Sequence, residues 1–410
     1  MKILVAQLGA RMHYAVPRIL EAQGLLSHFY TDTLVSNKGM IFDIFIDFIG
    51  KNFSIGAIQR LNRRRLKNVP SEKITSFDLL GYQYALELRN AKSLIEKEDI
   101  YLKYAEMFSA NIFKTAIPSS TAFWGFNGAS EFIFKTAKSL KKTCILEQTI
   151  LPKQLEIDIL RAEIERNSDF IDRKQFLLQS NSRIASAENE EWQLADKIIV
   201  ASDFVANGLQ SLGVPSSKVR VVPYGVDIPK KSMVKDKSGE RTRKKLKVLF
   251  VGEVGLRKGA PDLLIALDSL PASSFQAKFV GQVNLNQKVI NKYSSIVDFL
   301  GVVPASAMET YFNWADVVVL PSLVEGSPTV IYEAISFGKP VITTPNAGSV
   351  VEDGVHGRII PPGSPAYISQ ALAAYIEDEE LLEYHSRNSF DGRNGVSFAT
   401  YKEALSKALT

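Results

Sequence analysis

Short runs of apolar and β-branched residues recur along the chain, with helix-like stretches between them. The runs that predict strands lie at 2–8, 144–149, 197–202, 219–225, 247–252, 317–322 and 340–344. Strands that alternate with helices form parallel sheets, because a parallel connection needs a long crossover that is usually helical. The pattern therefore predicts an α/β protein with doubly wound, Rossmann-like sheets.

One stretch interrupts this alternation. Residues 228–245 are polar, dense in charge and almost without large apolar side chains, as is typical of a linker. A chain of 410 residues is also too long for one ordinary core. We therefore expect an N-terminal domain at 1–228, a linker at 229–245, a C-terminal domain at 246–394, and a last helix at 395–410 that packs on one or both domains.

The composition is that of an ordinary globular enzyme, with 46% hydrophobic and 23% charged residues and a net charge of +5. The single cysteine, Cys144, cannot form an internal disulfide, which fits a reducing compartment. The N-terminus lacks the apolar length of a signal peptide. The most apolar stretch, 41–50, is interrupted by Asp43 and Asp47 and is shorter than the roughly 20 residues that span a bilayer. We expect a cytoplasmic protein that does not cross the membrane.

A first candidate site follows the strand at 247–252. The strand ends at Gly252, the next loop carries Arg257 and Lys258, and a helix is expected to begin near Pro261. Two cations and the free N–H groups of a helix start favour phosphate, since both oppose its negative charge. A solvated loop with a turn glycine is the alternative for this spacing.

A second candidate site follows the strand at 317–322, where Pro328 is expected to begin another helix. The unpaired N–H groups at its start would be those of Gly326, Ser327, Thr329 and Val330. They predict a second anion site at the sheet edge where ligands of α/β proteins bind.

Two glutamates accompany this helix. Glu325 precedes it, and Glu333 lies inside it beside apolar Ile331 and Ala334. A carboxylate buried on that face needs hydroxyl or N–H partners, and a ribose diol offers two hydroxyls. The alternative is that both are surface residues, one of them an acidic residue near the helix N-terminus.

Several ordered motifs resemble one family. The E-x7-E pattern at 325–333, its continuation to 344, VVEDGVHGRIIPPG at 350–363 and VGEVGLRKG at 251–259 are similar to the C-terminal domain of glycosyltransferase family 4, retaining enzymes of the GT-B fold. The resemblance implies two Rossmann-like domains that face each other across a cleft. It implies a hexosyltransferase of polysaccharide or glycolipid synthesis, with a UDP- or GDP-sugar as co-substrate, a saccharide or lipid-linked acceptor, and no cofactor or metal.

The same resemblance implies roles for individual residues. Lys258 would contact the diphosphate, Glu333 would hold the ribose hydroxyls, and Glu325 would lie beside the transferred sugar. Val302, after an expected strand end at 299–304, would meet the nucleobase through its main chain. The backbone near the sugar hydroxyls and phosphate would be that of Gly326, Ser327 and Pro328.

The chain also departs from the family pattern. Glu253 stands where many members have an arginine, which leaves Arg257 as the source of a second phosphate charge. The candidate catalytic residues are therefore Glu325, Lys258 and Arg257.

The N-terminal half matches the family more loosely. Gly9 stands where a pair of glycines is common, and Gly9 with Ala10 would let the backbone approach the donor's phosphate side. His13 occupies the place of a frequent family histidine, although it also suits a helix cap. Glu147 and Gln148 stand where many members have a histidine. His13, Glu147 and Gln148 are the candidates for the acceptor side.

Residues 51–67 carry six cations and no acid, with apolar residues at near-helical spacing. A basic amphipathic helix can lie on an anionic membrane surface, which would make the protein peripheral at the inner face of the membrane. The alternative is a solvated helix that packs its leucines on the N-terminal domain. One short patch without a recognised module argues against nucleic-acid binding.

A dinucleotide reductase is disfavoured because the first strand is not followed by G-x-G-x-x-G. A sugar-nucleotide epimerase of GT-B architecture and a non-catalytic donor-binding protein stay open beside the glycosyltransferase.

Overall fold

The computed structural model describes residues 1–34, 64, 66, 68–115, 117–171, 182–229 and 245–409. The expected linker, apart from its two end residues, and the basic segment, apart from Arg64 and Leu66, lie outside these ranges. The chain divides into two compact units: unit 1 comprises 1–148, 177–199 and 214–219, and unit 2 comprises 149–176, 200–213 and 220–410. Segments 149–176 and 200–213 precede the expected linker and yet group with unit 2. The expected domain boundaries stay a prediction.

The first sheet has seven strands in the order β3-β2-β1-β4-β5-β6-β7. Its strands are β1 (Ile3–Gln7), β2 (Leu26–Thr31), β3 (Ile74–Ser76), β4 (Ala122–Phe126), β5 (Thr143–Gln148), β6 (Lys197–Val200) and β7 (Val219–Val221). The helices along this part of the chain are α1 (Ala15–Ala22), α4 (Asp78–Asn90), α5 (Leu94–Lys114), α6 (Glu131–Ser139), α7 (Lys153–Arg166), α8 (Arg183–Leu194) and α9 (Asp203–Ser211). Short 3-10 turns are η1 (Arg11–Tyr14), η2 (Ser71–Lys73), η3 (Ser168–Phe170) and η5 (Ser216–Lys218).

The second sheet has six strands in the order β10-β9-β8-β11-β12-β13. Its strands are β8 (Leu246–Val251), β9 (Phe275–Val280), β10 (Val297–Gly301), β11 (Val317–Leu320), β12 (Val341–Thr343) and β13 (Gly357–Ile359). The helices are α10 (Ala260–Asp268), α11 (Gln287–Tyr293), α12 (Met308–Trp314), α13 (Thr329–Ser336), α14 (Pro365–Glu377), α15 (Glu379–Gly392) and α16 (Phe398–Leu409). Further 3-10 turns are η6 (Leu256–Lys258), η7 (Ala305–Ala307), η8 (Pro345–Ala347) and η9 (Arg393–Val396).

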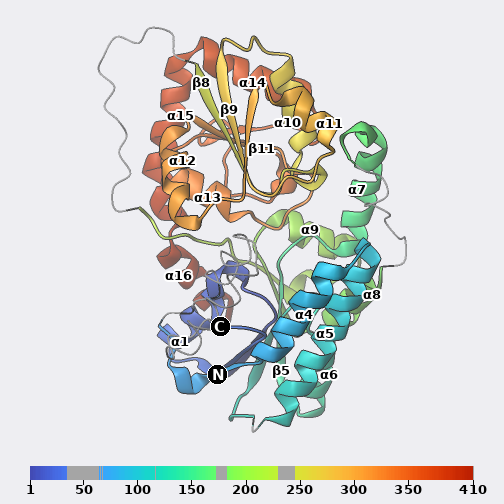
Figure 1. Ribbon diagram of the computed structural model, residues 1–410. Coiled ribbons are helices and arrows are strands. Elements are labelled where there is room, and N and C mark those ends of the chain that lie inside the picture. The colour runs from blue at the N-terminus through green and yellow to red at the C-terminus, as the bar shows by residue number, and fades with distance from the viewer. Residues whose placement is uncertain are drawn as a thin grey trace, which may run out of the picture. The chain divides into compact units, whose positions relative to one another are not determined.

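Both strand orders are doubly wound. The first strand of each sheet is central and pairs in parallel with the second and the fourth. Helices lie on both sides of the second sheet, with α12, α13 and α15 on one side and α10 and α11 on the other (Figure 1). The expected α/β class with two parallel sheets is confirmed. Ligands of such sheets bind where the strand order reverses, which in unit 2 is the carboxyl edge between β8 and β11.

Several strands near the sheet centres are buried along their whole length. Every residue of β1, β4 and β11 is buried, because helices cover both faces of a parallel sheet. Continuous apolar runs predicted seven strands correctly, β1 and β11 among them, but not the equally buried β4. No helix in the described part of the chain has the length and apolar character needed to cross a membrane.

Candidate functional site

The turn after β8 positions two cations. Gly252 has φ +141°, and a side chain there would come within 2.7 Å of Lys258 Cδ, so the glycine leaves room for the lysine to lie over the strand end. Arg257 and Lys258 end η6, Gly259 follows with φ +68°, and α10 begins at Ala260. The helix start expected near Pro261 is confirmed.

The loop after β11 is tied to this turn. The carbonyl of Arg257 accepts hydrogen bonds from the N–H groups of Leu323, at 2.9 Å, and Val324, at 3.3 Å. The Arg257 side chain donates to the carbonyl of Val324 at 3.1 Å. Pro328 occupies the N-cap of α13, which begins at Thr329. Both predicted phosphate-binding segments therefore meet at the point where the strand order reverses.

Glu325 joins them through one carboxylate oxygen. Its Oε1 lies 2.5 Å from Arg257 Nη1 and 2.6 Å from Lys258 Nζ. The side chains of Glu325 and Lys258 are each 12% exposed and that of Arg257 is 25% exposed, so the three charges are largely shielded from water. The ion cluster of Glu325, Arg257 and Lys258 thus carries one excess positive charge, which suits an anionic ligand.

Burial and these charges shift the three pKa values in different directions. Burial alone would raise the pKa of Glu325, but Lys258 and Arg257 outweigh it and hold that pKa below its usual value. Burial lowers the pKa of Lys258, aided by Arg257 and opposed by Glu325. Burial also opposes the charge on Arg257, but Glu325, together with Glu253 and Glu156, outweighs it and raises that pKa.

The start of α13 adds backbone donors. The N–H groups of Gly326, Ser327, Thr329 and Val330 have no protein partner among the described residues. They follow directly on Glu325, whose carboxylate holds both cations, and the helix dipole adds positive potential there. Two cations and several oriented N–H groups at one sheet edge can bind phosphate and stabilise negative charge that develops on it.

The other donor-side candidates lie in the same unit. Glu333 is half-buried on α13 between buried Tyr332 and Ala334. Val302 directly follows β10 and is 49% exposed. Their contacts with ribose and nucleobase stay predictions. Gly252, Gly281 and Gly301, which end or follow the adjacent strands β8, β9 and β10, all have positive φ, and none of these three positions places a side chain at this sheet edge.

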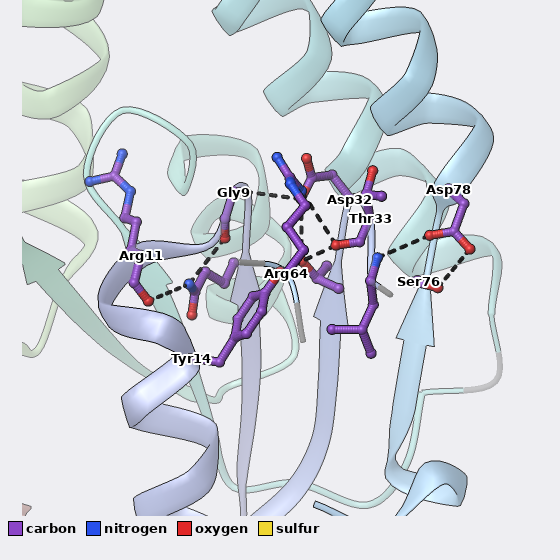
Figure 2. Close-up of polar contacts among 11 residues, drawn as sticks. Gly9, Arg11, Tyr14, Asp32, Thr33, Arg64, Ser76 and Asp78 are labelled. Atoms are coloured by element: carbon purple, nitrogen blue, oxygen red, sulfur yellow. Dashed lines mark hydrogen bonds and ion pairs between the residues drawn. The ribbon is translucent and has the colours of Figure 1, made fainter. Parts of the chain in front are cut away.

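Gly9 lies at the corresponding edge of unit 1. It has φ +85°, and its N–H donates to Asp32 Oδ1 at 3.0 Å (Figure 2). The same oxygen lies 2.7 Å from Nη1 of Arg64, the one cation of the basic segment whose contacts the structure describes. Asp32 is fully buried and follows β2, a strand that the apolar runs did not predict, so sequence reasoning missed it. A single aspartate after a strand of mixed apolar and polar residues offers no motif by which to find it.

The residues after Gly9 adopt an unusual backbone. Ala10 precedes η1, in which Met12, His13 and Tyr14 have φ values of 49°, 48° and 59°. Non-glycine residues pay a steric cost in this left-handed region. His13 is exposed and lies two residues before α1, while Tyr14 occupies its N-cap.

Glu147 and Gln148 belong to a buried polar network in unit 1. Glu147 accepts a hydrogen bond from Trp124 Nε1 at 3.2 Å, and Gln148 donates to Glu188 Oε1 at 2.9 Å. On the same helix as Glu188, burial raises the pKa of Glu191 to about 8 against the opposing N–H groups of Ser130 and Gly128. A role for Glu147, Gln148 or His13 toward an acceptor stays a prediction.

Within the described ranges, no group of three or more His, Cys, Asp or Glu residues could hold a metal ion.

Comparison with known proteins adds a family match. Residues 233–391 match the family model described as glycosyl transferases group 1. WcaL of Salmonella typhimurium, a putative colanic acid biosynthesis glycosyltransferase, is 26% identical over 255 residues, which are 58% of this chain and 60% of WcaL. TuaC of Bacillus subtilis, a putative teichuronic acid biosynthesis glycosyltransferase, is 30% identical over 167 residues, 39% of this chain and 42% of TuaC. The chain thus spans 60% or less of the length of these relatives.

Solved structures match over the whole chain. Anabaena HepE in complex with UDP and glucose has a TM-score of 0.62 at 15% identity, covering 100% of this chain and 99% of HepE. This likeness confirms the GT-B fold class of two α/β sheets. The family match places the similarity to glycosyl transferases group 1 in residues 233–391, less than half of the chain.

Proposed function

We propose that the protein is a retaining glycosyltransferase that moves a hexose-type sugar from a nucleotide-diphosphate sugar to a saccharide or lipid-linked acceptor. The observation that carries the proposal is the ion cluster of Glu325, Arg257 and Lys258 beside the start of α13. A nucleoside diphosphate is the ligand class that such a constellation suits at this edge of a doubly wound sheet. UDP is our first choice of nucleotide, because HepE binds it.

The chemistry needs the bond between the anomeric carbon and the β-phosphate oxygen to break. In the proposed reaction, negative charge grows on that oxygen while a new bond forms between the anomeric carbon and the acceptor hydroxyl on the same face of the sugar. The acceptor's proton passes to the departing phosphate. Lys258, Arg257 and the N–H groups from Gly326 to Val330 would stabilise the growing charge, and loss of one such donor in other enzymes costs roughly 3 kcal/mol of activation free energy. No bound metal is required for this scheme.

Glu325 is proposed to orient the two cations and the sugar rather than to attack it. Its oxygen Oε1 is engaged by both Arg257 and Lys258. A carboxylate held by two cations is a weak nucleophile, which argues against a covalent intermediate on Glu325.

The relatives suggest where the sugar goes. WcaL and TuaC are named for colanic acid and teichuronic acid biosynthesis, both polysaccharides. We propose an acceptor of the same class, held mainly by unit 1, and a cytoplasmic protein that contacts the inner membrane surface through residues 51–67.

A donor panel tests the proposal. UDP- and GDP-sugars are assayed for nucleotide release with and without oligosaccharide or lipid-extract acceptors. We expect acceptor-dependent release that falls at least tenfold in Lys258→Ala and Glu333→Ala, as for loss of about 1.4 kcal/mol of binding or transition-state stabilisation. Conversion of donor without an acceptor would indicate an epimerase. If neither UDP nor GDP at millimolar concentration raises the melting temperature, the donor site is disproved.

A further inference from the structure

We infer that Ser202 is a positioning residue, which turns the Gly326–Ser327 peptide so that the Ser327 N–H can bind the donor's diphosphate. The inference rests on the proposed function and adds a residue remote in sequence to its site. Ser202 lies in segment 200–213, two residues after β6, and this segment groups with unit 2. Neither the motifs nor the spacing of the C-terminal half points to it.

The key contact is one buried hydrogen bond. Ser202 is 6% exposed, and its hydroxyl donates to the carbonyl of Gly326 at 2.5 Å. A trans peptide is planar, so the carbonyl of Gly326 and the N–H of Ser327 point in opposite directions. By holding the carbonyl on its own side, Ser202 directs the Ser327 N–H to the other side, where that N–H has no partner among the described residues.

Other carbonyls of this loop are also held by protein donors. Asn346 Nδ2 donates to the carbonyl of Leu323 at 2.9 Å, and Arg257 Nη1 donates to that of Val324 at 3.1 Å. Together with the Gly326 carbonyl, which Ser202 holds, three carbonyls of the loop accept hydrogen bonds from protein donors. Without these bonds, the carbonyls could turn toward an anion and repel it. The loop can then present N–H groups to phosphate without reorganising during the reaction, which is the arrangement that makes backbone donors effective.

Two close backbone approaches keep this peptide in place. Gly348 has φ +61°, and a side chain on it would come within 2.4 Å of both Gly326 O and Ser202 Oγ. A side chain on Gly326 would come within 1.9 Å of Thr149 O. Ser202 therefore reaches the Gly326 carbonyl through space that Gly348 leaves, while Thr149 covers Gly326 from another direction.

Ser202 has a second, purely structural contact. It is the N-cap of α9 and accepts a hydrogen bond from Val205 N at 3.4 Å. The test must separate capping from peptide positioning. Glycine is well tolerated at N-caps, so Ser202→Gly removes the hydroxyl donor with little loss of helix capping. Ser93→Gly is the matched control, because Ser93 caps α5 through Glu96 N at 3.1 Å in an exposed position of unit 1.

The experiment titrates the full chain with UDP by calorimetry and with uridine, which lacks phosphate, by ligand-observed NMR. We expect Ser202→Gly to weaken UDP binding about tenfold, the effect of losing a hydrogen bond to a charged group, with uridine binding unchanged. Ser202→Thr, which keeps the hydroxyl, should stay within about twofold of the unchanged protein. Ser202→Ala serves as a second variant should the glycine variant not fold.

The outcomes separate this inference from the proposed function. Binding of UDP by the unchanged protein together with equal binding by Ser202→Gly overturns the role of Ser202 alone. An equal loss for Ser93→Gly, or an equal loss for uridine, also overturns it, because the effect would then be one of helix capping or stability. Failure of the unchanged protein to bind UDP or GDP overturns both proposals.

Discussion

At the scale of single residues, the carboxylate of Glu325 contacts both cations of the candidate site. Glu325 Oε1 lies within 2.6 Å of both Arg257 Nη1 and Lys258 Nζ. Burial and the charge of Arg257 lower the pKa of Lys258, and Glu325 opposes this shift. Lys258 would bind a diphosphate in its protonated, positively charged form. That form therefore depends on the negative charge of its neighbour Glu325.

Replacement of Glu325 by glutamine should expose this dependence. Without the carboxylate, the folded-state pKa of Lys258 falls further below its ordinary value, so the lysine loses its proton at a lower pH. We expect UDP affinity to begin to decline at a lower pH than in the unchanged protein, because one nearby negative charge has been removed. Affinity measured between pH 7 and 10 would show it.

The control is Glu253→Gln. Glu253 is exposed, accepts a hydrogen bond from Asn284 Nδ2 at 2.8 Å and makes only a minor contribution to the pKa of Lys258. Its variant should move the alkaline limb much less. Coincident profiles for Glu325→Gln and the unchanged protein would refute the coupling.

At the scale of elements, the turn from β8 to α10 depends on a close backbone approach. Gly259 has φ +68°, and a side chain there would come within 2.0 Å of Pro321 O in the loop after β11. Gly301 has nearly the same φ, +66°, but nothing lies within 4 Å of its Cβ position. A substitution at Gly301 therefore reports only the cost of a side chain on a left-handed backbone. A substitution at Gly259 adds the cost of lost contact between the two loops.

Alanine at each position tests this difference. We expect Gly301→Ala to lower the free energy of unfolding by about 1–2 kcal/mol, the cost of a left-handed alanine. Gly259→Ala should cost about 2–5 kcal/mol, because overpacking against Pro321 adds to that cost. Denaturant unfolding of unit 2, followed by fluorescence, measures both. Equal losses of unfolding free energy in the two variants would mean that the loop around Gly259 accommodates the added methyl group without further cost.

The sequence predicted β1 and β11, which are buried at every residue, but missed β4, which is buried just as uniformly. Strands such as β11 read as continuous apolar runs because both faces are covered. β9 was not predicted, because the polar residues Gln276 and Lys278 alternate with its buried residues. Lys258 and Glu325 could be found because they lie within motifs beside predicted helix starts. Asp32 and Ser202 could not, because their roles come from contacts with residues distant in sequence.

At the scale of the whole molecule, the units do not follow the chain order. The helix α7 precedes the expected linker by some 60 residues and yet belongs to unit 2. Arg166 at its end holds it there: Nη2 lies 2.6 Å from Glu163 Oε2 and 2.9 Å from Asp262 Oδ1, and Nη1 donates to the carbonyl of Gly363. The carboxylates of Asp262 and Glu163 are 0% and 5% exposed, so both depend on Arg166 for compensation of their charge.

Arg166→Met should therefore destabilise unit 2 in a pH-dependent way. Burial already raises the pKa of Asp262, and Arg166 opposes that rise, so its removal raises the folded-state pKa further above the unfolded value. A carboxyl shifted in this direction loses stability as pH rises through that window. We expect a loss of about 3 kcal/mol at pH 8 and clearly less at pH 5.

Two further variants decide whether the buried charge is the cause. Adding Asp262→Asn to Arg166→Met removes the uncompensated carboxylate and should recover part of the stability at pH 8 while flattening the pH dependence. Arg161→Met, on the same helix but in an exposed pair with Asp158 at 3.5 Å, should change stability by less than about 1 kcal/mol at either pH. A loss that is the same at pH 5 and pH 8, and that Asp262→Asn does not relieve, would instead assign the effect to the packing of Arg166. The charge would then not be what keeps α7 with unit 2.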